Sequence, residues 1–322
     1  MVLFQKEVEH KMMKLIESVP NFSEGRRIEV VEEIIKECEG FEEVWVLDWS
    51  MDYDHNRSVV TLVGTPDQLI EALFKMTKKA SELIDLRKHK GEHPRMGATD
   101  VIPLVPVWNC KMEECVEASK KLGKRIGDEL NIPVYLYEKS ATTPLRENLA
   151  EIRKGEFEHF NEKISLDDWE PDFGPRKVHP TAGVTAVGAR EYLVALNVNL
   201  KTDKIDVAKN IAKAVRNSSG GFKYVKAIGI ELKEKGIVQV SMNLTNYKKS
   251  PIYRVFELIK LEAQRYGVQI AGTEIIGLVP MDSLVRVAEF YLQLENFDSS
   301  RILEKKILDI LAEEIEKRNG EM

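Results

Sequence analysis

The chain has no long hydrophobic run, few cysteines and no block of positive charge. No segment reaches the roughly 18 consecutive apolar residues of a membrane span, and residues 1–14 are too charged for a secretory signal. The three cysteines include no C-x-x-C pair, and an odd number argues against a disulfide framework. A net charge of −6 repels polyanions. We therefore expect a cytoplasmic protein that binds neither nucleic acid nor membranes.

The apolar residues recur in one pattern that is used twice. A chain of 322 residues with 43% apolar content is long enough for two compact domains. In the first half, periodicity predicts strands 15–19, 43–48, 58–63 and 101–107 and helices 26–38 and 66–84. In the second half it predicts strands 192–198, 225–232, 238–244 and 275–279 and helices 205–215 and 252–266. Each half has the order β-α-β-β-α-β, so we predict an α+β fold of two ferredoxin-like subdomains side by side, with a ligand groove between them.

Composition also predicts where these parts begin and end. Additional elements are expected at 113–130 (helix), 134–137 (strand), 283–294 (helix) and 300–318 (helix), whereas 138–180 is expected to be largely irregular. The predicted division is an N-terminal extension at 1–13 that is poorly ordered, a first subdomain at 14–182, a second subdomain at 183–298 and a C-terminal helix at 299–322. We expect that last helix to pack on the protein or to form a dimer contact.

Residues 91–100, GEHPRMGATD, form the most informative segment. Because proline crowds the residue before it, His93 is held in an extended conformation outside any helix. Gly91 and Gly97 bracket the bend, where glycine adopts conformations closed to other residues. Polar groups stand on either side, namely Glu92, Arg95 and Asp100. The pattern indicates an imidazole held at a fixed angle for acid–base chemistry, with a structural loop histidine as the alternative.

The same segment contains a misleading match to a zinc motif. His89, Glu92 and His93 spell H-x-x-E-H, which binds zinc only when both histidines lie on one face of a helix. Gly91 and Pro94 disfavour that helix. We expect no metal.

Four polar segments resemble those of glutamate formiminotransferase, the folate enzyme of histidine breakdown. They are VPNFSEG (19–25), DHNRSV (54–59), GEHPRMGATD (91–100) and PDFGP (171–175), and the resemblance extends from about Lys14 to about Phe297. It implies transfer of a formimino group from N-formimino-L-glutamate to nitrogen 5 of tetrahydrofolate, giving 5-formiminotetrahydrofolate and L-glutamate. It further implies that tetrahydrofolate is the acceptor substrate, that the protein is a homodimer and that a separate cyclodeaminase acts on the product.

The resemblance and the chemistry together assign roles in the first subdomain. The catalytic histidine of the family falls on His93, which can carry protons because a histidine titrates near neutral pH. A carboxylate should hold the amidinium of the donor, and Asp54 is the first choice, with Asp52, Asp100 and Glu24 as alternatives. Guanidinium groups bind carboxylates in a bidentate manner, so we assign Arg57 and Arg95 to the carboxylates of the glutamate portion of the donor. Arg57 is also predicted to be a catalytic residue. Asn21, His55 and Asn56 complete the predicted substrate contacts.

The folate is expected to contact both halves of the chain. Within DWEPDFGPRK the resemblance places folate contacts at Trp169, Asp172, Phe173, Gly174, Pro175, Arg176 and Lys177. A rigid linker between the subdomains is the alternative role of this segment. In the second subdomain the candidate contacts are Asn197, Asn199 and Gly277, with Asn243 nearby.

Two other functions fit the same residues. The scaffold could move a formyl group between 5-formyltetrahydrofolate and glutamate, which needs the same pocket and the same proton transfer. It could also be a non-catalytic folate-binding protein, although such a protein has no use for an imidazole beside an acid and two arginines.

Overall fold

The computed structural model describes residues 13–91 and 93–320, so that almost all of the predicted extension 1–13 lies outside the described residues. These residues form two compact units that divide between Arg190 and Glu191. The division comes later than the predicted boundary between 182 and 183. The cause is a strand, Thr185–Ala189, which belongs to the sheet of the first unit.

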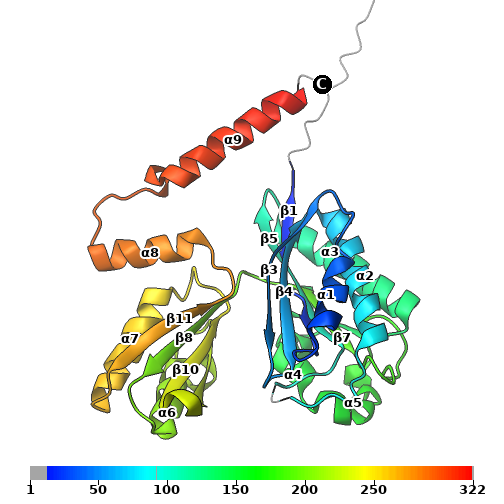
Figure 1. Ribbon diagram of the computed structural model, residues 1–322, viewed down its shortest axis with the longest axis horizontal. Coiled ribbons are helices and arrows are strands. Elements are labelled where there is room, and N and C mark those ends of the chain that lie inside the picture. Colours follow the sequence, from blue (N-terminus) through cyan, green and yellow to red (C-terminus); the bar gives the residue numbers. More distant parts are fainter. Residues whose placement is uncertain (1–12, 92, 321–322) are drawn as a thin grey trace, which may run out of the picture. The chain divides into compact units, whose positions relative to one another are not determined.

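The first unit contains the predicted β-α-β-β-α-β order (Figure 1). Its elements are β1 (Leu15–Ser18), β2 (Asn21–Phe22), α1 (Ile28–Lys36), β3 (Val44–Asp52), β4 (Arg57–Gly64), α2 (Pro66–Leu83) and β5 (Thr99–Trp108). Both β1 and β2 lie between β4 and β5, antiparallel to each, and β3 pairs with the other side of β4. Pro20, which has no N–H to donate, separates β1 from β2.

Further elements extend this sheet and add helices to both of its faces. They are α3 (Met112–Leu130), β6 (Val134–Leu136), α4 (Leu149–Arg153), α5 (Glu156–Ile164) and β7 (Thr185–Ala189). Strand β7 lies between β5 and β6 and is parallel to both. Short 3-10 turns occur at Glu138–Ser140, Pro144–Arg146 and Asp167–Trp169.

The prediction of a largely irregular stretch at 138–180 was wrong. Helices α4 and α5 have five and nine residues, which is shorter than the window of about 11 to 18 residues in which helical periodicity becomes visible. They are held by tertiary packing, since Ile152, Phe160 and Ile164 are buried in one apolar cluster with Tyr135 and Trp169.

The two faces of the first sheet bury different clusters. Ile102 and Val187 point toward the larger core, which includes residues of α1, α2 and α3. Val101 and Ala186, their neighbours along the strands, belong to the cluster of α4 and α5. Because successive side chains of a strand alternate between faces, this sheet is covered on both sides. Figure 1 shows α1, α2 and α3 together on one face.

The second unit repeats the order with a simpler sheet. Its elements are β8 (Val194–Leu200), α6 (Ile205–Val215), β9 (Val225–Leu232), β10 (Ile237–Leu244), α7 (Ile252–Arg265) and β11 (Ile270–Ile276). The strand order is β11-β8-β10-β9, with antiparallel neighbours throughout. The predicted elements of this half are found with shifts of a few residues, except that the strand predicted at 275–279 lies earlier, at Ile270–Ile276, and shares only two residues with the prediction.

Two helices follow this sheet. They are α8 (Met281–Leu292) and α9 (Leu303–Gly320), which confirms the two predicted C-terminal helices. A 3-10 turn at Ser299–Arg301 precedes α9, and others occur at Asn217–Ser219 and Lys233–Lys235. Helix α9 exposes apolar side chains at Leu303, Ile307, Leu308, Ile310 and Leu311. Among the described helices, none is long and apolar enough to cross a membrane.

Candidate active site

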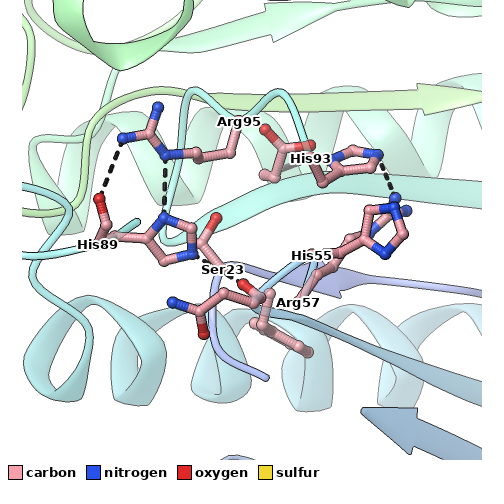
Figure 2. Close-up of a pocket in the computed structure, with 9 residues that line it drawn as sticks. Ser23, His55, Arg57, His89, His93 and Arg95 are labelled. Carbon is pink, nitrogen blue, oxygen red and sulfur yellow. Dashed lines mark hydrogen bonds between the residues drawn. The ribbon is translucent and has the colours of Figure 1, made fainter. Parts of the chain in front are cut away.

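A small pocket in the first unit collects residues from three of the four polar segments (Figure 2). It lies where β2 ends, where β3 turns into β4, and where the loop after α2 reaches β5. Its lining residues are Phe22, Ser23, His55, Asn56, Arg57, His89, His93, Arg95 and Asp100. Five of the predicted site residues therefore meet in one place together with His93.

Asn56 ties the three segments together. Its side-chain oxygen accepts a hydrogen bond from the N–H of Gly25 at 2.9 Å, and its side-chain nitrogen donates to the carbonyl of Lys90 at 3.0 Å. The residue has a φ of 49°, which asparagine tolerates better than most residues. Gly91 is required beside it, because a Cβ there would collide with the carbonyl of His55. Both ends of the Asn56 amide are thus used within the protein.

His93 and Arg57 are in direct contact. The Nη1 group of Arg57 donates a hydrogen bond to Nε2 of His93, as the dashed line in Figure 2 shows. A guanidinium can only donate, so neutral His93 carries its proton on Nδ1. Burial, together with the charges of Arg57 and Arg153, lowers the pKa of His93 to about 3, although Asp100 opposes the shift. In this state the imidazole is neutral at physiological pH.

Arg57 is half-buried and incompletely bonded. Burial lowers the pKa of its guanidinium to about 10, with a further contribution from Arg153. Its Nε atom is buried and has no hydrogen-bond partner among the described residues. An unpaired buried donor is costly, so a ligand acceptor that reached this edge of the guanidinium would be stabilised.

Asp100 connects the pocket to α4. One of its carboxylate oxygens accepts from the N–H of Met96 at 2.9 Å. The other accepts from Nε and Nη2 of Arg153 at 2.8 and 2.5 Å. The carboxylate is buried and fully bonded. The sequence analysis missed Arg153 because it lies in the stretch predicted to be irregular, where no motif or periodicity marked it.

Arg95 is occupied by other protein groups. Its Nε donates to Nδ1 of His89 at 3.0 Å, and its two terminal nitrogens contact the carboxylates of Glu156 and Glu158 at 3.0 and 2.5 Å. His89 donates in turn from Nε2 to the carbonyl of Asn56 at 2.7 Å. This chain of bonds runs from α5 to the β3–β4 turn. A donor carboxylate could bind Arg95 only if these bonds were broken.

The residues of the H-x-x-E-H match are not arranged as in a zinc peptidase. His89 and His93 both lie outside helices, because α2 ends at Leu83. The Nε2 atom of each ring already has a partner in this pocket, the carbonyl of Asn56 for His89 and Arg57 for His93. Within the described parts of the chain, no three His, Cys, Asp or Glu side chains are grouped as a metal site requires.

The other candidate carboxylates occupy different positions. Asp52 bonds His55 twice, through the backbone N–H and through Nδ1, both at 2.8 Å. Asp54 is exposed on the turn between β3 and β4. Glu24 accepts from the N–H groups of Arg26 and Arg27 at 2.9 and 3.0 Å, at the start of α1. Of the four candidates, Asp100 lines the pocket.

His55 and Asn21 complete the predicted substrate contacts. The ring centroid of His55 lies 6.1 Å from that of His93, at an interplanar angle of 66°. Asn21 donates from its side-chain nitrogen to the carbonyl of Val19 at 2.7 Å. Its side-chain oxygen is buried and has no partner among the described residues. Since the register pairs Asn21 with Val59, it lies two residues along β4 from Arg57.

The fourth segment, 168–177, is built into the first unit away from this pocket. Trp169 is buried in the apolar cluster of α4 and α5, with the ammonium group of Lys163 3.7 Å from the ring centroid. Asp172 accepts from the N–H of Leu136 at 2.8 Å and forms a buried ion pair with Arg146 at 3.0 Å. Within the described parts of the chain, residues 168–177 contribute no side chain to the pocket.

The turn that ends this segment packs against α3. Phe173 is partly buried on the larger core. Gly174 has a φ of 82°, and a Cβ there would come within 2.8 Å of the carbonyl of Ile132 and 3.0 Å of the Cα of Gly127. Arg176 donates to the carbonyls of Ile164 and Ser165 at 3.1 and 2.7 Å. Pro175 and Lys177 are exposed.

The candidate residues of the second unit lie on its own sheet. Asn199 donates to Glu274 at 3.0 Å and accepts from Gln239 at 2.8 Å. Asn197 is two residues away on β8, and therefore on the same face. Gly277 follows β11 with a φ of 71°, a left-handed conformation that favours glycine.

Comparison with known families and proteins agrees with this division of the chain. The formiminotransferase domain, N-terminal subdomain, matches residues 15–190, and the formiminotransferase domain matches residues 195–316. A glutamate formimidoyltransferase of Streptococcus pyogenes serotype M1 is 55% identical over 92% of this chain and 100% of its own length. The glutamate formimidoyltransferase of Thermoplasma acidophilum is 50% identical over 92% of the chain and 98% of its own length.

A bifunctional relative matches over part of its length. The formimidoyltransferase-cyclodeaminase of Dictyostelium discoideum is 43% identical over 88% of this chain, which corresponds to 54% of that protein. Both subdomain models and the full-length relatives point to one conclusion. The chain belongs to the formiminotransferase family.

Proposed function

We propose that this protein is a glutamate formimidoyltransferase, which transfers the formimino group of N-formimino-L-glutamate to nitrogen 5 of tetrahydrofolate. The observation that carries the proposal is the 55% identity to a glutamate formimidoyltransferase along the entire length of that relative. The products are 5-formiminotetrahydrofolate and L-glutamate. Tetrahydrofolate acts as the acceptor substrate, and the pathway is the breakdown of histidine.

The chemistry of this transfer calls for one group that moves protons. When nitrogen 5 attacks the formimino carbon, it forms a tetrahedral intermediate in which the attacking nitrogen must lose a proton. The nitrogen of the departing glutamate must gain one. A positioned imidazole can perform both transfers, which typically contributes about 10² to 10⁴ in rate. We assign this role to His93, whose Nε2 atom faces Arg57 in the pocket.

Arg57 is our choice for the carboxylate of the donor. It has a free, buried Nε edge, whereas the terminal nitrogens of Arg95 already contact Glu156 and Glu158. For the carboxylate that supports His93, Asp100 is better placed than Asp54, because Asp100 lines the pocket and Asp54 is exposed on the turn. A role for Asp54 stays a prediction, as do contacts from His55, Asn56, Asn21 and Glu24.

The architecture of both units is consistent with two ferredoxin-like subdomains. If the four main strands of each unit are numbered 1 to 4 along the chain, their order across the sheet is 4-1-3-2 in both units. This order corresponds to β5-β1-β4-β3 in the first unit and to β11-β8-β10-β9 in the second. The groove between the subdomains and the folate contacts in 168–177 and on β8 stay predictions. So do the homodimer, the separate cyclodeaminase, the cytoplasmic location and a reaction without metal.

An assay with two donors tests the proposal. The purified protein would be supplied with tetrahydrofolate and either N-formimino-L-glutamate or N-formyl-L-glutamate, and the folate products would be identified by mass. We expect 5-formiminotetrahydrofolate and L-glutamate to form with the first donor. Turnover of the formyl donor alone would establish the formyltransferase instead. Tight binding of tetrahydrofolate without turnover of either donor would identify a folate-binding protein.

A further inference from the structure

We infer that a carboxylate of the donor, bound by Arg57, gives His93 its ability to accept a proton, so that the imidazole acts as a base only when the donor is in place. The inference rests on the proposed function and adds to it a coupling between donor binding and catalysis. It concerns the unliganded pocket, in which Arg57 and His93 are already in contact.

The contact itself prevents His93 from acting as a base. A neutral imidazole has one nitrogen lone pair, and here Nε2 uses it to accept the N–H of Arg57. If His93 took up a proton at Nε2, two cationic groups would face each other and their hydrogen bond would be lost. The free pocket therefore stabilises the neutral ring.

The charges around His93 act on balance in the same direction, since Asp100 alone among the groups that face the ring favours the protonated form. The groups that face it are Arg57 at the start of β4, Arg153 at the end of α4, His55 on the turn between β3 and β4, and Asp100 on β5. Asp100 is already bonded to Arg153 and to the N–H of Met96. Two permanent cations thus oppose one carboxylate. With burial, they hold the pKa of His93 at about 3.

Arg57 is the cation in this group whose charge is not balanced by a direct ion pair. Arg153 has Asp100, whereas the nearby Asp52, whose charge also acts on Arg57, is bonded to His55. The Nε atom of Arg57 is buried without an acceptor in the described parts of the chain. A buried guanidinium binds a carboxylate strongly, because planar paired contacts suit both groups. The unpaired charge of Arg57 therefore favours an anionic ligand group, and the donor has two carboxylates.

Binding of that anion changes the proton balance. A carboxylate on the Nε edge neutralises the positive charge of Arg57, which faces His93. A nearby negative charge typically raises a histidine pKa by about 1 to 3 units. Once the Nη1 group of Arg57 moves away from Nε2 of His93, the lone pair of that nitrogen is released. The attacking nitrogen can then pass its proton to Nε2, and the ring returns that proton to the nitrogen of the departing glutamate. No proton is gained or lost overall. In the absence of the donor, the ring remains a weak base.

Titration of His93 by nuclear magnetic resonance tests this coupling without measuring turnover. The protein would be labelled with ¹⁵N-histidine, and the His93 signals would be assigned by comparison with His93→Gln. The probe is L-glutamate, the product, whose binding is verified by calorimetry. We expect saturating L-glutamate to raise the pKa of His93 by about 1 to 3 units. Bound L-glutamate with an unchanged His93 titration would overturn the inference and leave the proposed function intact.

Replacement of Arg57 gives a second, independent test. In Arg57→Gln the pKa of His93 should already be raised in the free protein, and L-glutamate should add no further shift. The matched control is Arg265→Gln, which removes an exposed arginine of α7 paired with Glu262. It should titrate like the unaltered protein. A His93 pKa in Arg57→Gln as low as in the unaltered protein contradicts the inference.

The two tests require that Arg57→Gln folds and that L-glutamate binds. If Arg57→Gln does not fold, the titration of the unaltered protein with and without L-glutamate still decides. If L-glutamate does not bind at all, the failure lies with the proposed function, and the coupling fails with it.

Discussion

The pocket around His93 and the segment 168–177 have similar compositions but use their polar side chains in opposite ways. Both contain arginine, aspartate and an aromatic or imidazole ring next to glycine and proline. In the segment, Asp172 is bonded to Arg146 and Trp169 is buried. In the pocket, Arg57 retains an unbonded edge and contacts a neutral histidine.

The two places differ in how the charge of the arginine is balanced. Arg146, whose Nε is also buried and unbonded, is paired with Asp172, whereas Arg57 has no carboxylate partner among the described residues. Side chains whose donors and acceptors are all bonded within the protein stabilise the fold. Those left unbonded and buried can be satisfied by a ligand. We therefore propose Arg57 and His93 as the reactive pair, whereas Trp169 is buried and Asp172 is paired with Arg146 within the first unit.

The largest expected effect is the loss of catalysis in His93→Gln. Without the imidazole, the proton transfers lose their carrier, and kcat should fall by about 10² to 10⁴-fold. The dissociation constant for tetrahydrofolate should stay within about threefold, as measured by fluorescence or calorimetry. The matched control is His159→Gln, in an exposed histidine of α5, which should retain normal turnover. Near-normal kcat in His93→Gln would rule out the role.

Replacement of Trp169 tests the other side of the comparison. Trp169→Ala removes a buried ring from the cluster of α4 and α5 and should lower the free energy of unfolding by about 3 to 5 kcal/mol. Trp108→Ala, at an exposed tryptophan of β5, should cost far less. Urea titrations measure both. If Trp169→Ala were as stable as the parent protein but had lost affinity for tetrahydrofolate, the segment would be a folate site as the sequence predicted.

The two arginines of the pocket should behave differently. Arg57→Gln should raise the KM for N-formimino-L-glutamate by about 10 to 100-fold, because a bond to a charged ligand group is lost. Arg95→Gln should leave this KM within about threefold. It should instead reduce stability by about 1 to 3 kcal/mol, since it breaks the bonds to His89 and Glu158. Steady-state kinetics and urea titrations separate the two, and the reverse result would assign the donor to Arg95.

The effect that is smallest near neutral pH is a change in stability with pH. The pKa of His93 is lowered to about 3 in the folded protein and is near 6.5 in an unfolded chain, so the unfolded state binds more protons between these values. Its contribution to stability is therefore present above about pH 6.5 and is lost as the pH falls toward 3. The slope is at most about 1.4 kcal/mol per pH unit. His93→Gln should flatten the curve of unfolding free energy in this range, and His159→Gln should not.

Local sequence patterns were sufficient for much of the fold. Long amphipathic helices and alternating strands gave the β-α-β-β-α-β order of both units, and α8 and α9 beyond them. The failures were short or weakly marked elements. Helices α4 and α5 are short, and β7, with the sequence TAVGA, is rich in small residues. All three are stabilised by burial against distant parts of the chain, which periodicity does not register.

The site divides in the same way. The motifs by themselves predicted that His93, Arg57 and Asp100 belong to functional segments, because the proline, the glycines and the polar side chains of those segments are unusual together. Only the tertiary structure decided which charges meet. It brought Arg153 from α4 to Asp100, occupied Arg95 with glutamates from α5 and left Arg57 with a free edge. Electrostatic partnership depends on distances of a few ångströms between residues far apart in the chain, and such distances are set by packing of the core.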